Sequence, residues 1–174
     1  MNRRLVSAAA VLSLGAGLGL VAPGSVSAQE ALVVCGSGNQ TQRYSPGLTY
    51  TTRDIAIHVS GSVGNCADPG RPSRSYATFE GSGQGKANCL LGALPTTVTY
   101  KWSDGKTSKI YFQAGVDAKP AGQSVVVVNG VVTAGEYEGH QAVKHILLTN
   151  VDVTKCATPD GIDETGGSTD LIIL

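Results

Sequence analysis

The chain of 174 residues balances 13 basic against 13 acidic side chains, and charged residues make up only 15% of it. This near-neutral balance argues against a basic surface for nucleic acid or anionic lipid. The sequence contains 23 glycines and four cysteines. This composition is typical of a disulfide-linked extracellular domain built of strands and tight turns.

The first 28 residues have the pattern of a signal peptide. A pair of arginines precedes an apolar stretch over residues 5–22, then Pro23 breaks the segment and small residues lead to Ala28. A transmembrane anchor is the alternative, but the glycines and the proline fit a removed peptide better. We expect export by the Sec or the twin-arginine route, cleavage after Ala28, and a single secreted domain over residues 29–174 with no membrane span.

The cysteines predict two disulfides, because an even number in an exported chain is the usual mark of a disulfide framework. A zinc site would need closely spaced pairs, and the sequence contains no C-x-x-C. Three pairings are open. The favoured one joins the nearest neighbours, Cys66 and Cys89, and leaves Cys35 to pair with Cys156.

The first half of the domain shows strands and turns in alternation. Residues 32–34 open it, and Arg53–Val59 alternates apolar and polar side chains, which places His58 on the outer face. We further expect a strand over 73–81, a bend over 81–85 where three glycines alternate, and a short strand over 89–91.

A hairpin over residues 96–113 is the clearest element. A two-residue turn would place Val98 and Ile110 on opposite faces of the sheet. A three-residue loop over 103–105, with Gly105 in the left-handed region, places both on one face. The register therefore predicts the three-residue loop.

The second half continues in the same way. Residues 124–133 form one long strand, favoured over a hairpin at Asn129, because the segment 135–139 offers a better reversal. The remaining expectations are strands over 142–148, 151–156 and 169–174, with a polar loop over 157–167. Together these elements predict an all-β fold: an antiparallel β-sandwich of roughly 8–10 strands, with a β-barrel as runner-up.

Four segments resemble small secreted proteins of actinobacteria with no assigned activity. They are Cys35-Gly36-Ser37-Gly38, Tyr44-Ser45-Pro46-Gly47-Leu48-Thr49, Trp102-x-Asp104-Gly105-x-Thr107-Ser108 and Gly130-Val131-Val132-Thr133-Ala134-Gly135-Glu136-Tyr137-Glu138-Gly139. The resemblance implies export and a β-sandwich-like fold, and it implies no chemistry.

The sequence offers no catalytic motif. His58 is expected at the surface, and a strand would point His140 and His145 to opposite faces, so no two-histidine metal site is expected. No G-x-S-x-G motif is present, and Gly36-Ser37-Gly38 is interpreted as a turn. Glu136 and Glu138 are interpreted as solvated charges. We therefore expect no catalytic residue, metal or cofactor.

Binding is the remaining function. The loop 67–75 is stiffened by proline and carries Arg71, Pro72 and Arg74, which makes it the candidate binding loop. Exposed tyrosines such as Tyr44, Tyr50 and Tyr137 offer stacking surfaces for sugar rings, but aromatics make up only 5% of the chain and form no flat strip like that of a carbohydrate-binding module. The leading hypothesis is a non-catalytic extracellular protein with a binding or structural role toward another protein or a polysaccharide. The alternatives are a protease inhibitor that uses the loop, and a hydrolase with a noncontiguous site.

Overall fold

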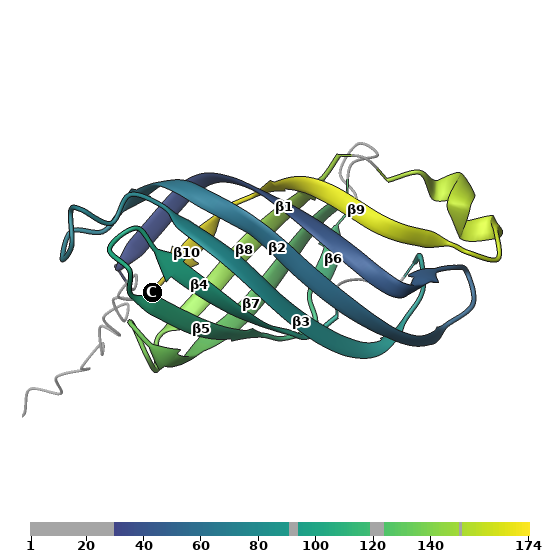
Figure 1. Cartoon of the computed structure of the whole chain (residues 1–174), viewed down its shortest axis with the longest axis horizontal. Helices are drawn as coiled ribbons and strands as arrows, with labels where there is room; N and C mark the ends of the chain where they lie inside the picture. The colour runs from purple at the N-terminus through teal and green to yellow at the C-terminus, as the bar shows by residue number, and fades with distance from the viewer. Residues whose placement is uncertain (1–29, 91–93, 119–123, 150) are drawn as a thin grey trace, which may run out of the picture.

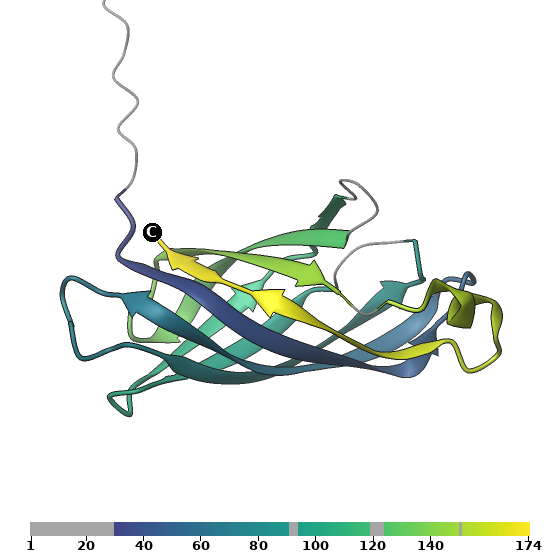
Figure 2. The same cartoon turned by 90° about the horizontal axis from the view of Figure 1, so that it is seen from above.

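The computed structural model describes residues 30–174 except 91–93, 119–123 and 150; the predicted signal peptide lies outside the described residues. The chain folds into strands and one short helix (Figures 1 and 2). The strands are β1 (Val33–Leu48), β2 (Arg53–Ala67), β3 (Ala77–Ala87), β4 (Thr96–Trp102), β5 (Thr107–Phe112), β6 (Val116–Ala118), β7 (Ser124–Gly135), β8 (Gln141–Leu148), β9 (Ile162–Thr169) and β10 (Leu171–Ile173), and the 3₁₀ helix is η2 (Val153–Ala157).

The strands close into an eight-stranded antiparallel barrel. From β1 to β5 each strand pairs with the next, β5 pairs with β7, and β7 pairs with β8. β9 and β10 follow one another along the same path and pair with both β8 and β1, which closes the ring. The predicted all-β fold is confirmed. The sandwich is wrong, and the runner-up barrel is the fold, because the last strands return to pair with the first.

The register of the predicted hairpin is confirmed. Val98 pairs with Ile110 and both are buried, while Gly105 has φ +83°. The backbone N–H of Trp102 donates to the carbonyl of Lys106 at 2.9 Å, as a three-residue loop requires. The long strand over 124–133 is also confirmed as part of β7.

Five local expectations are wrong. The short strand expected over 89–91 is one of them, because Cys89 and Leu90 lie in a turn, and residue 91 is outside the described residues. The glycine segments 36–38 and 81–85 continue the strands β1 and β3 instead of bending the chain. Residues 153–157 form the helix η2 instead of a strand, and most of the expected loop 157–167 belongs to β9. The bend predicted over 81–85 fails for a physical reason: a Cβ at Gly81 would lie 2.3 Å from the carbonyl oxygen of Thr97, and one at Gly83 would lie 1.9 Å from that of Pro95, so these glycines allow close approach of the neighbouring chain.

Inward glycines allow aromatic rings to fill the barrel. Gly61 of β2 is an example, since a Cβ there would lie 2.1 Å from the carbonyl oxygen of Asn39 and 2.8 Å from Cζ of Phe79. The ring of Phe79 continues into a column with Tyr100 and Trp102, whose centroids are 5.0 and 6.2 Å apart in turn. The core therefore lies inside the barrel, along its axis.

We expect Gly61→Ala to lower the free energy of unfolding by about 2–3 kcal/mol, because the added methyl overpacks the interior. Urea unfolding at neutral pH, followed by the fluorescence of Trp102, measures the change. Gly36→Ala is the matched control in the adjoining strand, because nothing lies within 4 Å of a Cβ there. Equal stability of the two variants would contradict this account of the interior.

Both disulfides form, but the predicted pairing is wrong. Cys35 bonds Cys66, and Cys89 bonds Cys156. The antiparallel register of β1 and β2 places Cys35 directly opposite Cys66. The second bond ties the turn after β3 to η2, at the end of the barrel remote from the described chain ends (Figure 1).

The end of the barrel at which the described chain starts and stops is here called the terminal end. Around it lie the loop 68–76, the β4–β5 turn and the β7–β8 turn (Figures 1 and 2). No helix among the described residues is long and apolar enough to cross a membrane.

Candidate functional site

Arg74 closes the terminal end of the barrel. Its side chain is 0% exposed although it comes from the loop between β2 and β3. The guanidinium lies 5.1 Å from the ring centroid of Trp102 and 5.2 Å from that of Tyr137. A cation held between two aromatic rings is stabilised by their π faces, so the loop is packed onto the barrel core.

Carboxylates surround this guanidinium. Nε and one terminal nitrogen of Arg74 donate to Oδ2 of Asp104 in the β4–β5 turn, the former at 3.2 Å. Carboxylate oxygens of Asp68 and Glu136 each lie 3.5 Å from it. Burial acts to lower the pKa of Arg74, but its hydrogen bonds to Asp104 and Tyr137 outweigh burial and raise the pKa overall. Arg74 is therefore a permanent cation here.

Tyr137 links the loop to the β7–β8 turn. Its hydroxyl donates to Asp68 and accepts from Arg74. Burial, and then the hydrogen bond to Asp68, raises the pKa of Tyr137, so the hydroxyl stays protonated at neutral pH. Tyr137 has a left-handed backbone, with φ 64° between Gly135 and Gly139, and this tight turn directs the ring over the barrel end.

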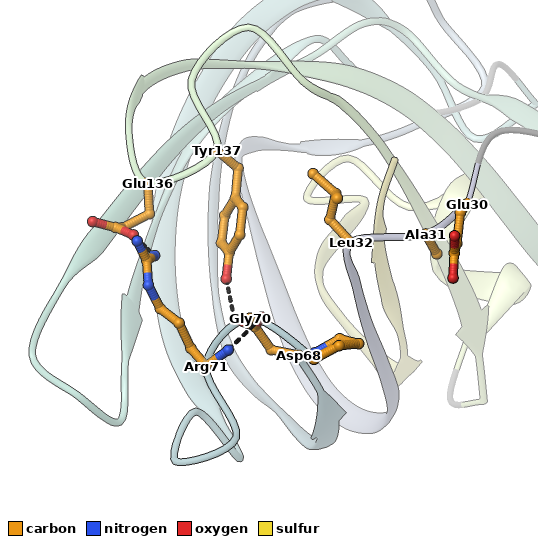
Figure 3. A pocket seen from close by; sticks show the side chains of 9 residues that line it. Glu30, Ala31, Leu32, Asp68, Gly70, Arg71, Glu136 and Tyr137 are labelled. Atoms are coloured by element: carbon orange, nitrogen blue, oxygen red, sulfur yellow. Dashed lines mark hydrogen bonds and ion pairs between the residues drawn. The ribbon is translucent and has the colours of Figure 1, made fainter.

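An open pocket of about 400 Å³ lies beside this cluster, and we call it the end pocket. Its walls come from the segment just before β1, the loop after β2 and the β7–β8 turn (Figure 3). The lining residues are Glu30, Ala31, Leu32, Asp68, Pro69, Gly70, Arg71, Glu136 and Tyr137. This volume lies within the range of small-molecule sites, about 300–1,000 Å³.

The lining of the end pocket carries several charged side chains. On one side Arg71 forms an ion pair with Glu136, and Leu32 lies between this pair and Glu30 (Figure 3). Glu30 has no ion pair with another described residue. The carboxylates of Glu30, Asp68 and Glu136 outnumber the single guanidinium in the lining, so the pocket carries an excess of negative charge.

The predicted binding loop divides into exposed and buried parts. Arg71 and Pro72 are exposed, and the backbone N–H of Arg71 donates to Oδ1 of Asp68 at 3.0 Å. Arg74 is buried in the cluster described above, so its side chain faces the barrel and not the solvent. The loop thus brings Arg71 into the end pocket and holds it there.

Two of the three histidines, His58 and His145, lie on strands away from this site. His140 is exposed in the β7–β8 turn, where its backbone N–H donates to the carbonyl of Tyr137 at 3.0 Å and its Nδ1 lies 2.8 Å from the carbonyl oxygen of Leu174. His58 is exposed, as its strand pattern predicts. Nδ1 of His145 lies 2.9 Å from both carboxylate oxygens of Asp170, a pairing that the sequence did not indicate. Within the described chain, no serine, threonine or cysteine side chain is hydrogen-bonded to this imidazole, and no group of three metal-ligating side chains is placed to hold a metal.

Sequence reasoning missed Asp104, Glu136 and Tyr137 as parts of one cluster. Asp104 and Tyr137 lie in segments expected to be turns, Tyr137 is considered from the sequence only as an exposed ring for sugar stacking, and Glu136 is interpreted as a solvated charge. The signal was a concentration of charged and aromatic residues in loops expected on the surface. Chemically, the end pocket can hold a small molecule against the charged side chains of the Arg74 cluster. The chain matches no protein-family model, and comparisons with curated proteins and with solved structures find no match either.

Proposed function

We propose that this protein is a secreted, non-catalytic binding protein whose end pocket holds a small amphipathic cation. The observation that supports the proposal is the pocket itself, about 400 Å³ in volume and lined by an excess of carboxylates. Two disulfides are consistent with an extracellular location.

The lining favours a ligand with an apolar body and one positive group. Leu32 and Ala31 offer an apolar wall, and the ring of Tyr137 offers a second surface (Figure 3). Arg71 and Glu136 neutralise one another, which leaves the carboxylate of Glu30 to pair with an incoming cation. Because the Arg74 cluster holds Tyr137 in place before binding, little ordering cost remains for the ligand to offset.

A matched pair of ligands tests both the pocket and its charge preference. We expect phenethylamine to shift the amide resonances of Gly70, Glu136 and Tyr137 saturably, and 3-phenylpropanoate, with a similar body and opposite charge, to bind about tenfold more weakly. Glu30→Gln should weaken phenethylamine binding about fivefold, as expected for an exposed charge pair.

The control variant is Glu80→Gln, which removes an exposed carboxylate from the outer face of β3 and should leave binding unchanged. No saturable shift at the pocket with either compound would reject the pocket as a binding site. Equal affinity for the two compounds would reject the cation preference.

The two alternative functions, protease inhibitor and hydrolase, each rest on fewer residues. A protease inhibitor would rest on Arg71, because Arg74 has no exposed surface to offer a protease. Arg71 is itself paired with Glu136 and would have to leave that carboxylate. A hydrolase would rest on the His145–Asp170 pair, whose imidazole is not hydrogen-bonded to a serine, threonine or cysteine side chain of the described residues.

A further inference from the structure

A second cavity lies inside the barrel, apart from the end pocket. It has a volume of about 20 Å³. Its walls are mostly apolar side chains, with the polar side chains of Gln40, Gln42, Thr96 and Lys144 among them. One buried water needs roughly 10–15 Å³, so the cavity has room for one small molecule or ion.

Lys144 brings a cation into this interior, where aromatic rings are its nearest partners. The residue is 2% exposed, and Nζ lies 3.9 Å from the ring centroid of Phe79. No hydrogen bond or ion pair joins it to another of the described side chains. The charge of Asp170 acts on Lys144, but both carboxylate oxygens of Asp170 are bound by His145.

Gln40 adds a second unsatisfied group to the same cavity. The residue is 3% exposed, and neither its amide nitrogen nor its amide oxygen has a hydrogen-bond partner in the described structure. Buried side-chain amides in folded proteins are almost always hydrogen-bonded. The amide N–H of Gln40 and the ammonium of Lys144 are therefore two donors that line one small space.

We propose that this cavity binds one small monovalent anion of the size of chloride, held by the ammonium of Lys144 and the amide N–H of Gln40. A buried ammonium is stabilised by a counter-charge, and an anion in the cavity supplies one in direct contact, whereas the carboxylate of Asp170 acts on Lys144 without forming an ion pair with it. The small volume of the cavity, about 20 Å³, favours a monatomic anion over a larger one such as sulfate.

Binding by this site depends on pH. Burial lowers the pKa of Lys144 to about 7, against a smaller opposing effect of Asp170. Tyr100 and Tyr44 are the other titratable groups close to the cavity lining, and burial raises the pKa of each, so both stay protonated at neutral pH. An anion therefore binds more tightly below pH 7, where Lys144 is charged.

The first test compares thermal unfolding in sodium chloride and in sodium gluconate at equal ionic strength. At pH 6 we expect chloride to raise Tm by about 3 °C, as for a ligand present at roughly ten times its Kd. At pH 9 the difference between the two salts should disappear. Lys144→Met should abolish it at both pH values, while Lys109→Met, which removes an exposed lysine of β5, should leave it intact.

The second test locates the anion. In crystals grown at pH 6 with sodium bromide, an anomalous-scattering peak beside Lys144 and Gln40 supports the proposal. Density for a water alone, equal Tm in chloride and gluconate for the wild-type protein, or a salt difference that persists in Lys144→Met overturns it. The wild-type comparison of pH 6 with pH 9 decides the matter even if a variant fails to fold.

Discussion

Replacing Arg74 with methionine is expected to lower the free energy of unfolding by about 3–4 kcal/mol, the usual cost of removing one partner from a buried ion pair. Methionine keeps much of the length of the side chain and removes the charge. The carboxylate of Asp68, which is 4% exposed, then keeps only neutral partners such as the hydroxyl of Tyr137. Urea unfolding followed by the fluorescence of Trp102 measures the loss, since Trp102 lies against Arg74.

Two further variants show whether the loss comes from burial. Arg43→Met removes one side of the Arg43–Glu164 pair, whose side chains are 71% and 51% exposed, and should cost less than about 1 kcal/mol. Asp68→Asn combined with Arg74→Met should recover part of the loss, because no buried carboxylate is then left without its cation. If Arg74→Met costs no more than Arg43→Met, the cluster does not hold the loop on the barrel.

The local structure was largely predictable because it depends on short-range pattern. The register of the hairpin follows from a choice between two turn lengths, and only one of them places Val98 and Ile110 on the same face. The reversal at 135–139 follows from its two glycines, Gly135 and Gly139, which both have positive φ. Each of these inferences uses residues that are close in the sequence.

Closure of the barrel was not predictable in this way. It depends on the pairing of β1 with β9 and β10, segments separated by most of the domain. An alternating strand of a sandwich and one of a barrel bury the same set of residues, so burial pattern alone does not separate them. The predicted disulfide pairing was wrong for the same reason. Cys35 lies opposite Cys66 because of the register between β1 and β2, which the spacing of the cysteines in the sequence does not reveal.

One feature of the sequence did favour the strongly curved sheet of a barrel. Three glycines alternate along β3 on its inward face, where a Cβ would meet β4 or the residues just before it; they are Gly81, Gly83 and Gly85. Glycines at a period of two mark a strand that another backbone approaches closely, as at a barrel corner. A bend and a close approach both favour glycine, and the sequence alone could not separate the two.

The end pocket and the interior cavity were missed from the sequence for different reasons. Arg71, Pro72 and Arg74 were correctly grouped in one loop, but whether a loop residue points outward depends on the distant residues that it meets. Lys144 was missed although it occupies an inward position between Ala142 and Ile146. A charged residue at a core position of an alternating strand is unusual, and it was the available sign of the interior cavity.

The protonation of Lys144 is expected to make the free energy of unfolding strongly dependent on pH. Lysine in an unfolded chain has a pKa near 10.5, and burial in the barrel lowers the pKa of Lys144 to about 7. Between these values the unfolded state binds one more proton than the folded state, so raising the pH disfavours unfolding. Below pH 7 both states carry the proton and this group adds no pH dependence.

In gluconate, where no small anion fills the cavity, wild-type stability should therefore rise by about 3 kcal/mol from pH 7 to pH 9.5 through this lysine. Lys144→Met should remove that rise and should make the protein more stable than wild type at pH 7 by about 2–4 kcal/mol. Above pH 10 buried tyrosines such as Tyr100 oppose the trend, because burial raises their pKa and only the unfolded chain ionises.

Urea unfolding across this range, with Lys109→Met as the exposed control, separates Lys144 from the other titrating groups. Subtracting the curve of Lys144→Met from that of the wild type removes the contributions that the two proteins share. A difference that stays constant from pH 7 to pH 9.5 would mean that Lys144 keeps its proton in the folded barrel. In that case the π face of Phe79 and the charge of Asp170 stabilise the buried ammonium more than burial destabilises it.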